Sequence, residues 1–496
     1  MTSWTTPQAG DGSDFCVRSD AGTCPLRPLV VDLDGTLIQR DLLAESFLAL
    51  LADRPALAIR SLSALRLGRA AFKARLADDA PLDVESLPID PAVLDYLRAE
   101  KARGRSLFIA SASDQRYVQA VAAYLGLFDG VFASSPGCNL AGAAKAERLC
   151  QAFGQGGFDY IGNSTADIPV WDRACDVLLA GVSVGLERRL RRRFSDRHIH
   201  CLTAPPSPLR HYPRALRVHQ WLKNILIFVP MLAAHKLSGQ AFLSSFLAFA
   251  SFCLCASSVY LLNDLLDLQS DRRHHHKRKR PCASGEMSVF HAAKLLVLFL
   301  LGSGLLALAL PWQFAVVLAA YYLLTLGYSL VLKRLAVIDV TALACLYGIR
   351  LFAGSMAGSV VLSPWIVAFS IFIFFSLAII KRVAELRENI VRNEQAPIRR
   401  GYELSDVPIL EAMAVASGYL AVLVMALYIN SPAVETLYGA PERLWPICML
   451  ILVWISRMFL LTHRGQMHED PVVFAATDRF SQLTCICLLV VVGISI

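Results

Sequence analysis

Two acidic residues near the start of the chain have the type and spacing needed for phosphate chemistry. Asp32 and Asp34 lie in DLDGTL (32–37), directly after the short apolar run 28–31. This pattern predicts a buried parallel strand that ends in a glycine turn. Two carboxylates at the end of a strand can share one Mg²⁺, while Asp32 attacks phosphorus as nucleophile and Asp34 serves as acid and base. The segment therefore predicts a phosphoryl-transfer site.

Three later segments supply the other groups that such a site needs. Ser111 ends an expected strand at 106–111, where its hydroxyl can hold a phosphoryl oxygen. Lys145 opens an expected helix, where its ammonium can neutralise charge on the transferred group. A third expected strand leads to Asp167.

In this order and at these spacings, the segments resemble the haloacid dehalogenase-like phosphatase superfamily over residues 28 to about 190. The resemblance implies an α/β, Rossmann-like domain with a small helical cap at 40–95. One position departs from the family pattern, because Gly162 is followed by Asn163 where the family has Asp. The resemblance implies that Asp32, Asp34, Asn163 and Asp167 hold Mg²⁺. An Asn oxygen can still bind the metal, but the change removes one negative charge and puts metal affinity and turnover in doubt. The alternative is a degenerate domain that is retained for docking or regulation.

A second acidic group lies at the end of an apolar run. Asp264, Asp267 and Asp271 are three and four residues apart, so a helix places them on one face, where they can gather Mg²⁺ around a diphosphate. Charge at the end of an apolar span is costly and usually functional. An ordinary basic loop would explain the nearby Lys and Arg, but not the three Asp. The polar residues expected to bind phosphate here are Asn263, Arg272, His274, Lys277, Arg278 and Arg280.

Other polar residues within or beside apolar runs are weaker candidates. They are Tyr328, Asp339 and Arg350. Trp221, with Lys223 and Asn224 close by, marks the entry to the first apolar run, although an aromatic residue is expected at a membrane interface in any case.

The composition assigns most of the chain to lipid. Of the 496 residues, 55% are hydrophobic and 18% are charged, and the mean hydropathy is +0.48. Acidic and basic residues balance over 1–210, so the whole net charge of +8 belongs to the apolar part that follows. We therefore expect an N-terminal extension at 1–27, a water-soluble domain at 28–198, a Pro-rich linker at 199–215 and a membrane domain at 216–496. The Arg-rich run before the linker is either a solvated helix face or a patch for anionic lipid.

Nine apolar runs are long enough to cross a bilayer. Basic residues gather in the loops at 272–280, 333–334, 381–400 and 464–479, which indicates that these loops and the N-terminal domain are cytoplasmic. The polar opening segment predicts no signal peptide. We expect an integral protein of the cell (inner) membrane, with its scattered cysteines reduced and no zinc site. The runs lie near 218–235, 241–262, 290–310, 313–332, 336–357, 361–380, 410–430, 443–462 and 480–496.

The membrane half resembles the UbiA superfamily of membrane prenyltransferases, whose first motif is Asn-Asp-x-x-Asp-x-x-x-Asp. The resemblance covers about 214–496 and implies an all-α bundle of nine helices around a lateral cavity open to lipid. Most members carry a second acidic motif after the sixth span, where this chain has Lys381, Arg382 and Glu385. Because this segment is partly cationic, it suits a second phosphate better than a neutral aromatic acceptor. With DRRHHHKRKRP, RRGYELSD and HEDPVVFAATDR, it resembles the branch that contains decaprenyl-phosphate phosphoribosyltransferase, apart from His275, where that branch generally has Pro.

The resemblance implies a bifunctional enzyme. Asp264 and Asp267, with Asp271 assisting, would hold Mg²⁺ on the diphosphate of phosphoribosyl diphosphate. The remaining phosphates would be held by Lys277, Arg278, Arg280, Lys381 and Arg382. A polyprenyl phosphate oxygen would attack ribose C1. The fused domain would raise its own effective concentration near the product, and we hypothesise that Asp32 removes the product's 5-phosphate.

Two other functions stay open. One is a conventional prenyltransferase that moves a polyprenyl chain from its diphosphate to an aromatic acceptor, for which a second acidic motif would be expected. The other is a non-catalytic membrane scaffold or lipid carrier, against which the two acidic groups speak. We expect no nucleic-acid partner.

Overall fold

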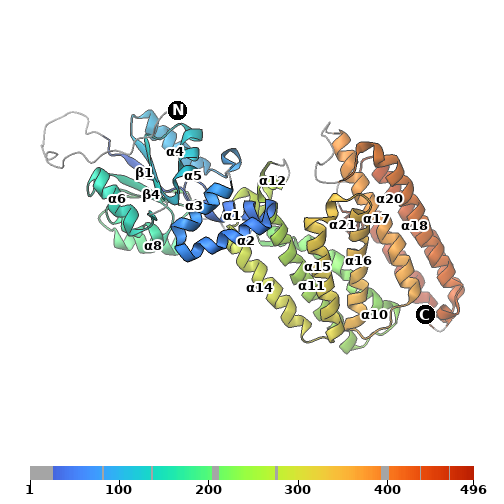
Figure 1. Ribbon diagram of the computed structural model, residues 1–496. Coiled ribbons are helices and arrows are strands. Elements are labelled where there is room, and N and C mark those ends of the chain that lie inside the picture. Colours follow the sequence, from blue (N-terminus) through green and yellow to red (C-terminus); the bar gives the residue numbers. More distant parts are fainter. Residues whose placement is uncertain are drawn as a thin grey trace. The chain divides into compact units, whose positions relative to one another are not determined.

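The computed structural model describes most of the chain as two compact units (Figure 1). One unit contains the chain up to Ala215 together with Leu262–Lys294, and the other contains Leu216–Leu261 with Leu295–Ile496. The described residues are 26–80, 83–135, 138–203, 212–273, 277–391, 401–435, 437–467 and 470–496.

The first unit is built on a six-stranded parallel sheet with the strand order β3-β2-β1-β4-β5-β6. The central strand β1 pairs with β2 and β4 in register, with Leu29 opposite both Leu107 and Asp159. All three residues of β1 are fully buried apolar side chains, as expected for a strand covered on both faces. The parallel sheet is consistent with the expected Rossmann-like domain. The strands are β1 (Leu29–Val31), β2 (Leu107–Asp114), β3 (Gly130–Ser134), β4 (Asp159–Gly162), β5 (Val177–Ala180) and β6 (Ile199–Thr203).

Helices connect the parallel strands, and the sheet continues beyond residue 198 through β6. The core helices are α4 (Pro91–Ala102), α5 (Gln115–Leu125), α6 (Ala143–Phe153), the short η3 (Thr165–Asp167) and α7 (Ile168–Trp171), and α8 (Val184–Arg193). The helical insert after β1 comprises α1 (Leu42–Asp53), α2 (Pro55–Ser61), η1 (Leu62–Leu67), α3 (Arg69–Asp79) and η2 (Val84–Ser86). It has a small apolar core of its own around Leu50, Phe72 and Leu76.

A second segment of the first unit carries the second acidic group. It begins at the end of α11 (Gly239–Leu266) and continues through α12 (Leu268–Arg273), η6 (Lys277–Lys279) and α13 (Pro281–Ser284) into α14 (Val289–Ala307). This segment packs on the helical insert. The buried Arg40 donates to the carbonyl oxygens of Cys282 and Met287, and the Arg272 guanidinium pairs with Glu45 of α1 at 2.9 Å.

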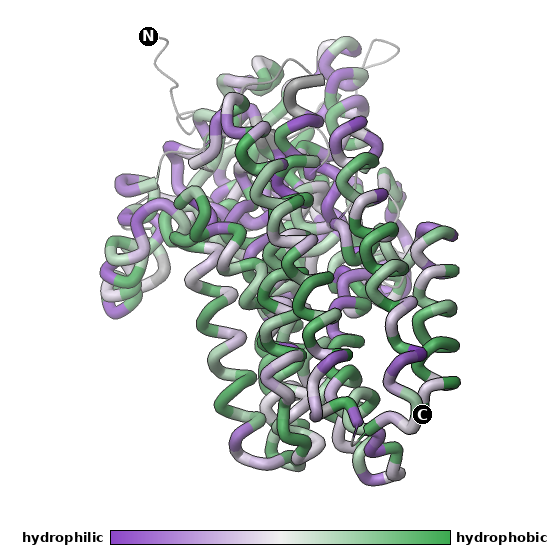
Figure 2. The backbone as a smooth tube through the Cα atoms, turned by 90° about the vertical axis from the view of Figure 1, so that its right-hand side faces the viewer, coloured by the Kyte–Doolittle hydropathy of each residue, from purple (hydrophilic) through white to green (hydrophobic). Residues whose placement is uncertain are grey.

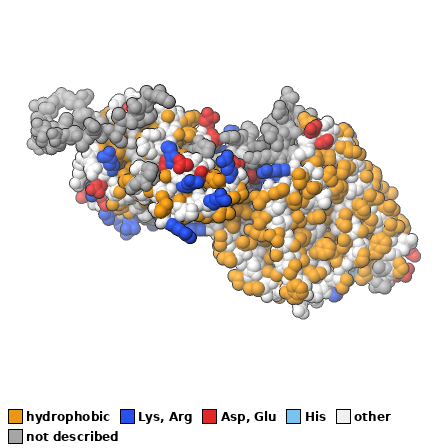
Figure 3. All heavy atoms as spheres, in the orientation of Figure 1, with side chains coloured by type: hydrophobic (Ala, Val, Ile, Leu, Met, Phe, Trp, Pro, Cys, Tyr) orange, Lys and Arg blue, Asp and Glu red, His pale blue; other side chains and the backbone are white. Residues whose placement is uncertain are grey.

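The second unit is a helical bundle whose outer faces are apolar. Figure 2 shows long hydrophobic stretches along its helices, and hydrophobic side chains cover the face of it seen in Figure 3. Leu305 and Leu323 are examples of large apolar side chains that it exposes. Its elements, besides α11 and α14, are η5 (Val218–Phe228), α10 (Val229–Ala233), α15 (Trp312–Leu330), η7 (Leu332–Arg334), α16 (Ile338–Ala357), α17 (Pro364–Val391), η8 (Leu404–Asp406), α18 (Val407–Ile429), α19 (Pro432–Glu435), η9 (Pro441–Leu444), α20 (Trp445–His463), α21 (Pro471–Thr477) and α22 (Arg479–Ser495).

Seven helices of the described chain are long and apolar enough to cross a membrane, and an eighth crossing is possible if α21 and α22, bent by 81°, count as one. The protein is therefore an integral membrane protein, but the nine expected crossings are not all found as such helices. The run expected at 218–235 forms the 3₁₀ helix η5 followed by the short α10. Gly354 of α16 lies against it so closely that a Cβ would stand 2.0 Å from the carbonyl oxygen of Ile227.

Candidate active sites

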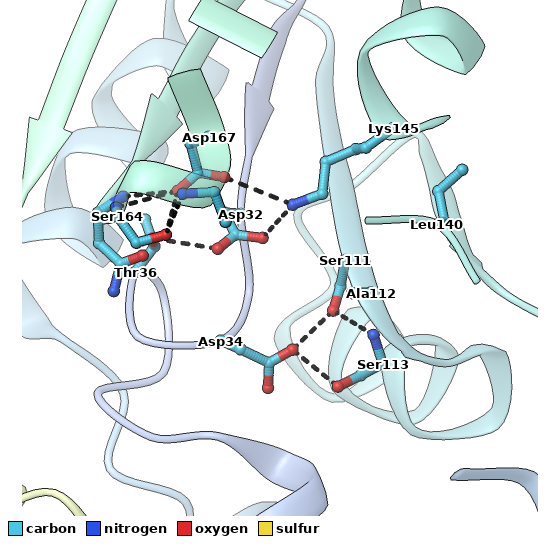
Figure 4. A network of polar contacts seen from close by, with 12 residues as sticks. Asp32, Asp34, Thr36, Ser111, Ala112, Ser113, Leu140, Lys145, Ser164 and Asp167 are labelled. Carbon is cyan, nitrogen blue, oxygen red and sulfur yellow. Dashed lines mark hydrogen bonds and ion pairs between the residues drawn. The ribbon is translucent and has the colours of Figure 1, made fainter. Parts of the chain in front are cut away.

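Asp32 and Asp34 lie where β1 ends, at the carboxyl edge of the sheet (Figure 4). Ligand sites of open parallel sheets form at this edge. Asp32 is buried and accepts a hydrogen bond from Lys145 Nζ at 2.7 Å. The turn after Asp34 uses Gly35 at φ 80°, and a Cβ there would meet the side-chain nitrogen of Asn163 at 2.1 Å. Only glycine therefore fits this turn beside Asn163.

Lys145 and Asp167 reach Asp32 from two different elements. Lys145 lies in the first turn of α6, and its Nζ is 3.6 Å from Asp167 Oδ1. The buried Tyr160 hydroxyl accepts from Lys145 at 3.0 Å and donates to Asp167 at 2.9 Å. Asp167 Oδ2 accepts from the backbone N–H groups of Asn163 and Ser164, which fixes its orientation. The structure thus brings together Asp32, Lys145, Asn163 and Asp167, which the sequence predicts to share one site.

Asp34 is held by neutral donors. Its Oδ2 accepts from Ser111 Oγ at 2.8 Å and from Ser113 Oγ at 2.7 Å, and its Oδ1 accepts from the backbone N–H of Leu42 at 2.9 Å. Ser111 therefore contacts a predicted acid/base residue, as Figure 4 shows. These bonds orient the Asp34 carboxylate but leave its negative charge uncompensated.

The charges of this site suit a divalent cation. Asp32, Asp34 and Asp167 supply three carboxylates, and Lys145 supplies one ammonium, as Figure 4 shows. Burial raises the pKa of Asp32 to about 7, and the carboxylates of Asp167 and Asp34 also raise it, against the opposing effect of Lys145. A surplus of buried negative charge formed by oxygen ligands fits Mg²⁺. Asn163 lies within this group but contributes no charge.

The second acidic group keeps helical spacing although α11 ends at Leu266. Backbone N–H groups of Asp267 and Asp271 donate to the carbonyl oxygens of Asn263 and Asp267, both at 2.8 Å. Asp264 and Asp271 are buried, and Arg280 Nη1 donates to them at 3.2 and 2.6 Å. Burial raises the pKa of Asp271, and Arg280 opposes that effect. The all-oxygen set of three carboxylates is suited to Mg²⁺.

The basic residues around this group have different surroundings. Arg272 donates hydrogen bonds to Glu45 and, at 3.3 Å, to the carbonyl oxygen of Ala283. Its guanidinium therefore binds these groups rather than pointing toward a phosphate, as was expected. Lys277 is partly buried and Arg278 is exposed, both on η6. His274, also expected to bind phosphate, lies outside the described residues, as does His275.

In the second unit, two lysines converge on one carboxylate, which we name the Asp470 cluster (Lys223, Tyr347, Lys381 and Asp470). Asp470 Oδ2 accepts from Lys223 Nζ at 2.6 Å and from Lys381 Nζ at 3.0 Å, and Tyr347 donates to its Oδ1 at 2.9 Å. Two ammonium groups against one carboxylate leave a positive charge, which suits an anionic ligand.

Arg382 belongs to a separate network. It is buried and donates to Asp339 at 2.7 and 2.9 Å and to Glu385, and Tyr328 also donates to Asp339 at 2.9 Å. The guanidinium is thus occupied by carboxylates rather than directed at a phosphate. Arg350, another candidate, donates to Asn224 at 2.8 Å and is in a position to anchor η5 to α16.

An apolar cavity of about 620 Å³ adjoins the Asp470 cluster along three elements. Its wall includes Leu222, next to Lys223, and Pro471, next to Asp470. Leu377 contributes from α17, one turn before Lys381. An apolar cavity beside a positively charged cluster fits a ligand with an anionic head and a hydrocarbon tail.

Several residues of the candidate sites were not predicted from the sequence. Ser113 could have been found, because it shares a strand face with Ser111. Tyr160 lies in a fully buried strand, where the sequence does not reveal which face meets the site. Asp470 lies in the segment HEDPVVFAATDR, which the sequence analysis singled out as a whole without assigning a role to this residue. Tyr347 is a single polar residue in an apolar run, and its contact with Asp470 depends on helix packing.

Comparisons with known proteins confirm the family expected for each half of the chain. Residues 225–482 match the UbiA prenyltransferase family, and residues 29–172 match the haloacid dehalogenase-like hydrolases. Protein y4nM of Sinorhizobium fredii is 36% identical over 92% of this chain and 88% of its own length, so the similarity spans both halves.

Two further relatives match the membrane half. Nodulation protein NoeC of Azorhizobium caulinodans is 36% identical over 56% of this chain and 91% of its own length. Decaprenyl-phosphate phosphoribosyltransferase of Mycolicibacterium smegmatis is 29% identical over 57% of this chain and 91% of its own length. Both halves thus match families of enzymes. The chain belongs to the UbiA prenyltransferase family, in the branch similar to decaprenyl-phosphate phosphoribosyltransferase, and it carries an N-terminal haloacid dehalogenase-like domain.

Proposed function

We propose that this protein transfers a phosphoribosyl group from phosphoribosyl diphosphate to a polyprenyl phosphate, and that its N-terminal domain removes the 5-phosphate of the product. The observation that carries the transferase assignment is the Asp470 cluster, where Lys223 and Lys381 share one carboxylate beside an apolar cavity. A conventional prenyltransferase with a neutral aromatic acceptor would not need this positive charge. The similarity to decaprenyl-phosphate phosphoribosyltransferase supports the same choice.

In the transferase reaction, a polyprenyl phosphate oxygen forms a bond to ribose C1 as the bond from C1 to the diphosphate breaks. We assign the diphosphate to the acidic group, where Asp264, Asp267 and Asp271 would hold Mg²⁺. When bound, the metal neutralises charge that develops on the leaving diphosphate. Asn263, Lys277, Arg278 and Arg280 are assigned to the donor's phosphate oxygens. Lys223 and Lys381 are assigned to the phosphate of the lipid, whose tail enters the apolar cavity.

In the phosphatase reaction, an Asp32 oxygen attacks phosphorus, and the bond from phosphorus to the sugar oxygen breaks. Asp34 gives a proton to that oxygen and then takes one from the water that releases phosphate from Asp32. Lys145 and Ser111 hold the phosphoryl oxygens. Asp32, Asp34, Asn163 and Asp167 would hold Mg²⁺, and the bound metal would shield the carboxylates from the anionic substrate.

We further propose the organisation of the chain. The phosphatase domain spans 28–198 with the addition of β6, and the transferase domain spans 216–496. The soluble domain faces the cytoplasm from the cell (inner) membrane, in keeping with the basic loops. The transferase crosses the membrane nine times, with η5 and α10 as the first crossing.

The transferase assignment is tested with radiolabelled phosphoribosyl diphosphate and polyprenyl phosphate. Label should enter the lipid fraction only with Mg²⁺, and Asp264→Asn should abolish it. Asp95→Asn, at an exposed ion pair of α4, is the matched control and should label lipid as the wild type does. Transfer of a prenyl chain from its diphosphate to an aromatic acid, without ribose transfer, would contradict the assignment.

The phosphatase assignment is tested on the isolated product lipid. The wild-type protein should release inorganic phosphate, which malachite green detects, and the product should lose the mass of its 5-phosphate. Asp32→Asn should release none, because the nucleophile is replaced by a neutral amide. Equal release of phosphate by Asp32→Asn and by the wild type would contradict the assignment.

A further inference from the structure

The helical insert of the soluble domain exposes a row of large apolar side chains. The helices α2 and η1 follow each other directly, and residues three apart in such helices lie on the same side. Ile59, Leu62 and Leu65 are 64%, 41% and 47% exposed, and Leu67, at the end of η1, is 83% exposed. We name these four residues the outer face of the insert. Single exposed apolar residues are common, but several on one face indicate a binding surface.

The opposite side of the same helices carries small residues and packs inward. Ala58 and Ser61 are buried, and Ala64 and Leu57 pack against the small apolar core of the insert. The insert is therefore packed through its small residues, while the large apolar side chains of the outer face contribute little to that core. This arrangement reverses the usual one for a water-soluble domain, where the larger apolar side chains are buried.

Arginine side chains accompany the outer face. Arg60 and Arg66 each follow one of its residues in the sequence, Arg54 directly precedes α2, and all three are exposed. From Arg54 onward the chain has no acidic residue before Asp78. An apolar helix face with arginines beside it is typical of segments that lie in the head-group region of a membrane, where guanidinium groups bind lipid phosphates.

The insert is attached to a loop that adjoins two membrane helices. Its first segment contacts 272–287 through Arg40 and through Glu45 of α1. That loop follows the end of α11 and precedes α14, and both helices are long and apolar enough to cross a membrane. A lipid surface is therefore close to the insert in the protein as it exists. A second copy of the chain is a poorer partner, because two such faces would bring like charges together.

We propose that the outer face of the insert binds the surface of an anionic phospholipid membrane. Its apolar side chains enter the boundary between head groups and acyl chains, and Arg54, Arg60 and Arg66 bind the lipid phosphates. The inference does not depend on the proposed function, since it requires only that the chain is an integral membrane protein.

Photocrosslinking in the full-length protein tests the inference. The photoreactive residue p-benzoylphenylalanine replaces Leu65, and the protein is reconstituted into liposomes of phosphatidylglycerol and phosphatidylcholine with radiolabelled acyl chains. On illumination, labelling should exceed by roughly fivefold or more that of the same probe in place of Tyr124, an exposed residue in the last turn of α5. Equal labelling at the two positions would overturn the inference. So would a crosslink from position 65 to a second copy of the chain in place of lipid.

Arginine variants test the contribution of charge. The triple variant Arg54→Gln, Arg60→Gln and Arg66→Gln should lower lipid labelling at position 65 by roughly threefold or more. Replacement of the same three residues by Lys should preserve most of the labelling, because the charge remains. Unchanged labelling in the Gln variant would contradict the binding of anionic lipid.

The matched control removes the same number of charges from another helix of the soluble domain. It replaces three exposed arginines of α8 by Gln, namely Arg188, Arg189 and Arg192. Labelling at position 65 should stay as in the wild type. An equal fall in the two Gln variants would show that net charge, rather than the outer face of the insert, attracts the lipid, and would overturn the inference.

Discussion

At the scale of single residues, the sequence predicted the carboxylates better than their partners. Asp32, Asp34 and Asp167 follow strands, and the carboxyl ends of parallel strands meet at one edge, so local pattern was enough to group them. Tyr160 and Asp470 could not be predicted in the same way, because their positions depend on packing between distant elements. The pairing of Arg382 with Asp339 also depends on contacts across helices.

Asn163 offers a test of the metal proposed for the soluble domain. Asn163→Asp adds a fourth carboxylate to the site and should lower the Mg²⁺ concentration for half-maximal phosphatase activity by roughly tenfold, since ligand charge sets the affinity for hard cations. Asn163→Ala should raise it. A titration of activity with Mg²⁺ after chelation measures both, and identical titrations for the three proteins would contradict the assigned ligand.

At the scale of elements, the sequence predicted the strands and most apolar helices, but not how the acidic loop packs. The segments 40–45 and 272–287 lie far apart in the chain, and their contact is formed by Arg40 and by the pair of Glu45 with Arg272. Both side chains of that pair are at most 5% exposed. Ion pairs between distant segments leave no periodic signal, and so the sequence suggested phosphate binding for Arg272 instead.

Removing the charge of Glu45 should destabilise this packing. Glu45→Gln leaves Arg272 without a buried counter-charge, which typically costs about 3 kcal/mol or more. The expected result is a clear fall in the temperature at which half of the phosphatase activity is lost on heating. Asp95→Asn removes one partner of an exposed pair and should change that temperature little. Equal shifts in the two variants would show that the buried pair contributes no more than a surface pair.

The close approach of α16 and η5 gives a second test at this scale. Gly354→Ala would place a Cβ 2.0 Å from the Ile227 carbonyl oxygen, so the two elements must separate. Gly348→Ala, on the same helix, meets no atom within 4 Å and should be neutral or slightly stabilising. Thermal unfolding in detergent, followed by circular dichroism, should show a lower midpoint for Gly354→Ala only, by roughly 2 kcal/mol in stability. A similar midpoint for the two variants would contradict the close packing.

At the scale of the whole molecule, the proposal of nine membrane crossings depends on the segment before α11. The chain up to Ala215 and the segment Leu262–Lys294 belong to one compact unit. If both lie on the same side of the membrane, the chain between them crosses an even number of times. The proposal assigns one of these crossings to α11 and the other to η5 with α10.

These two elements are long enough in spite of their few residues. The 3₁₀ helix η5 has 11 residues and α10 has 5. At rises of about 2.0 and 1.5 Å per residue, they extend over roughly 30 Å, which equals the thickness of a bilayer's hydrocarbon core. The apolar run at 218–235 marks this segment in the sequence, although neither η5 nor α10 alone is a helix long enough to cross.

Nine crossings place the two ends of the chain on opposite sides of the membrane, whereas eight place them on the same side. We therefore expect a reporter enzyme that is active only outside the cytoplasm to be active when fused after Ile496 and inactive when fused before Met1. The same reporter inserted after Lys236 should be active, and one inserted after Arg334 should be inactive. Inactivity of both terminal fusions with activity after Lys236 would mean that α21 and α22 do not form one crossing. Inactivity of both terminal fusions and of the insertion after Lys236 would mean that η5 and α10 do not cross. The basic loop after α11 would then lie outside the cell, contrary to the side on which Lys and Arg are retained.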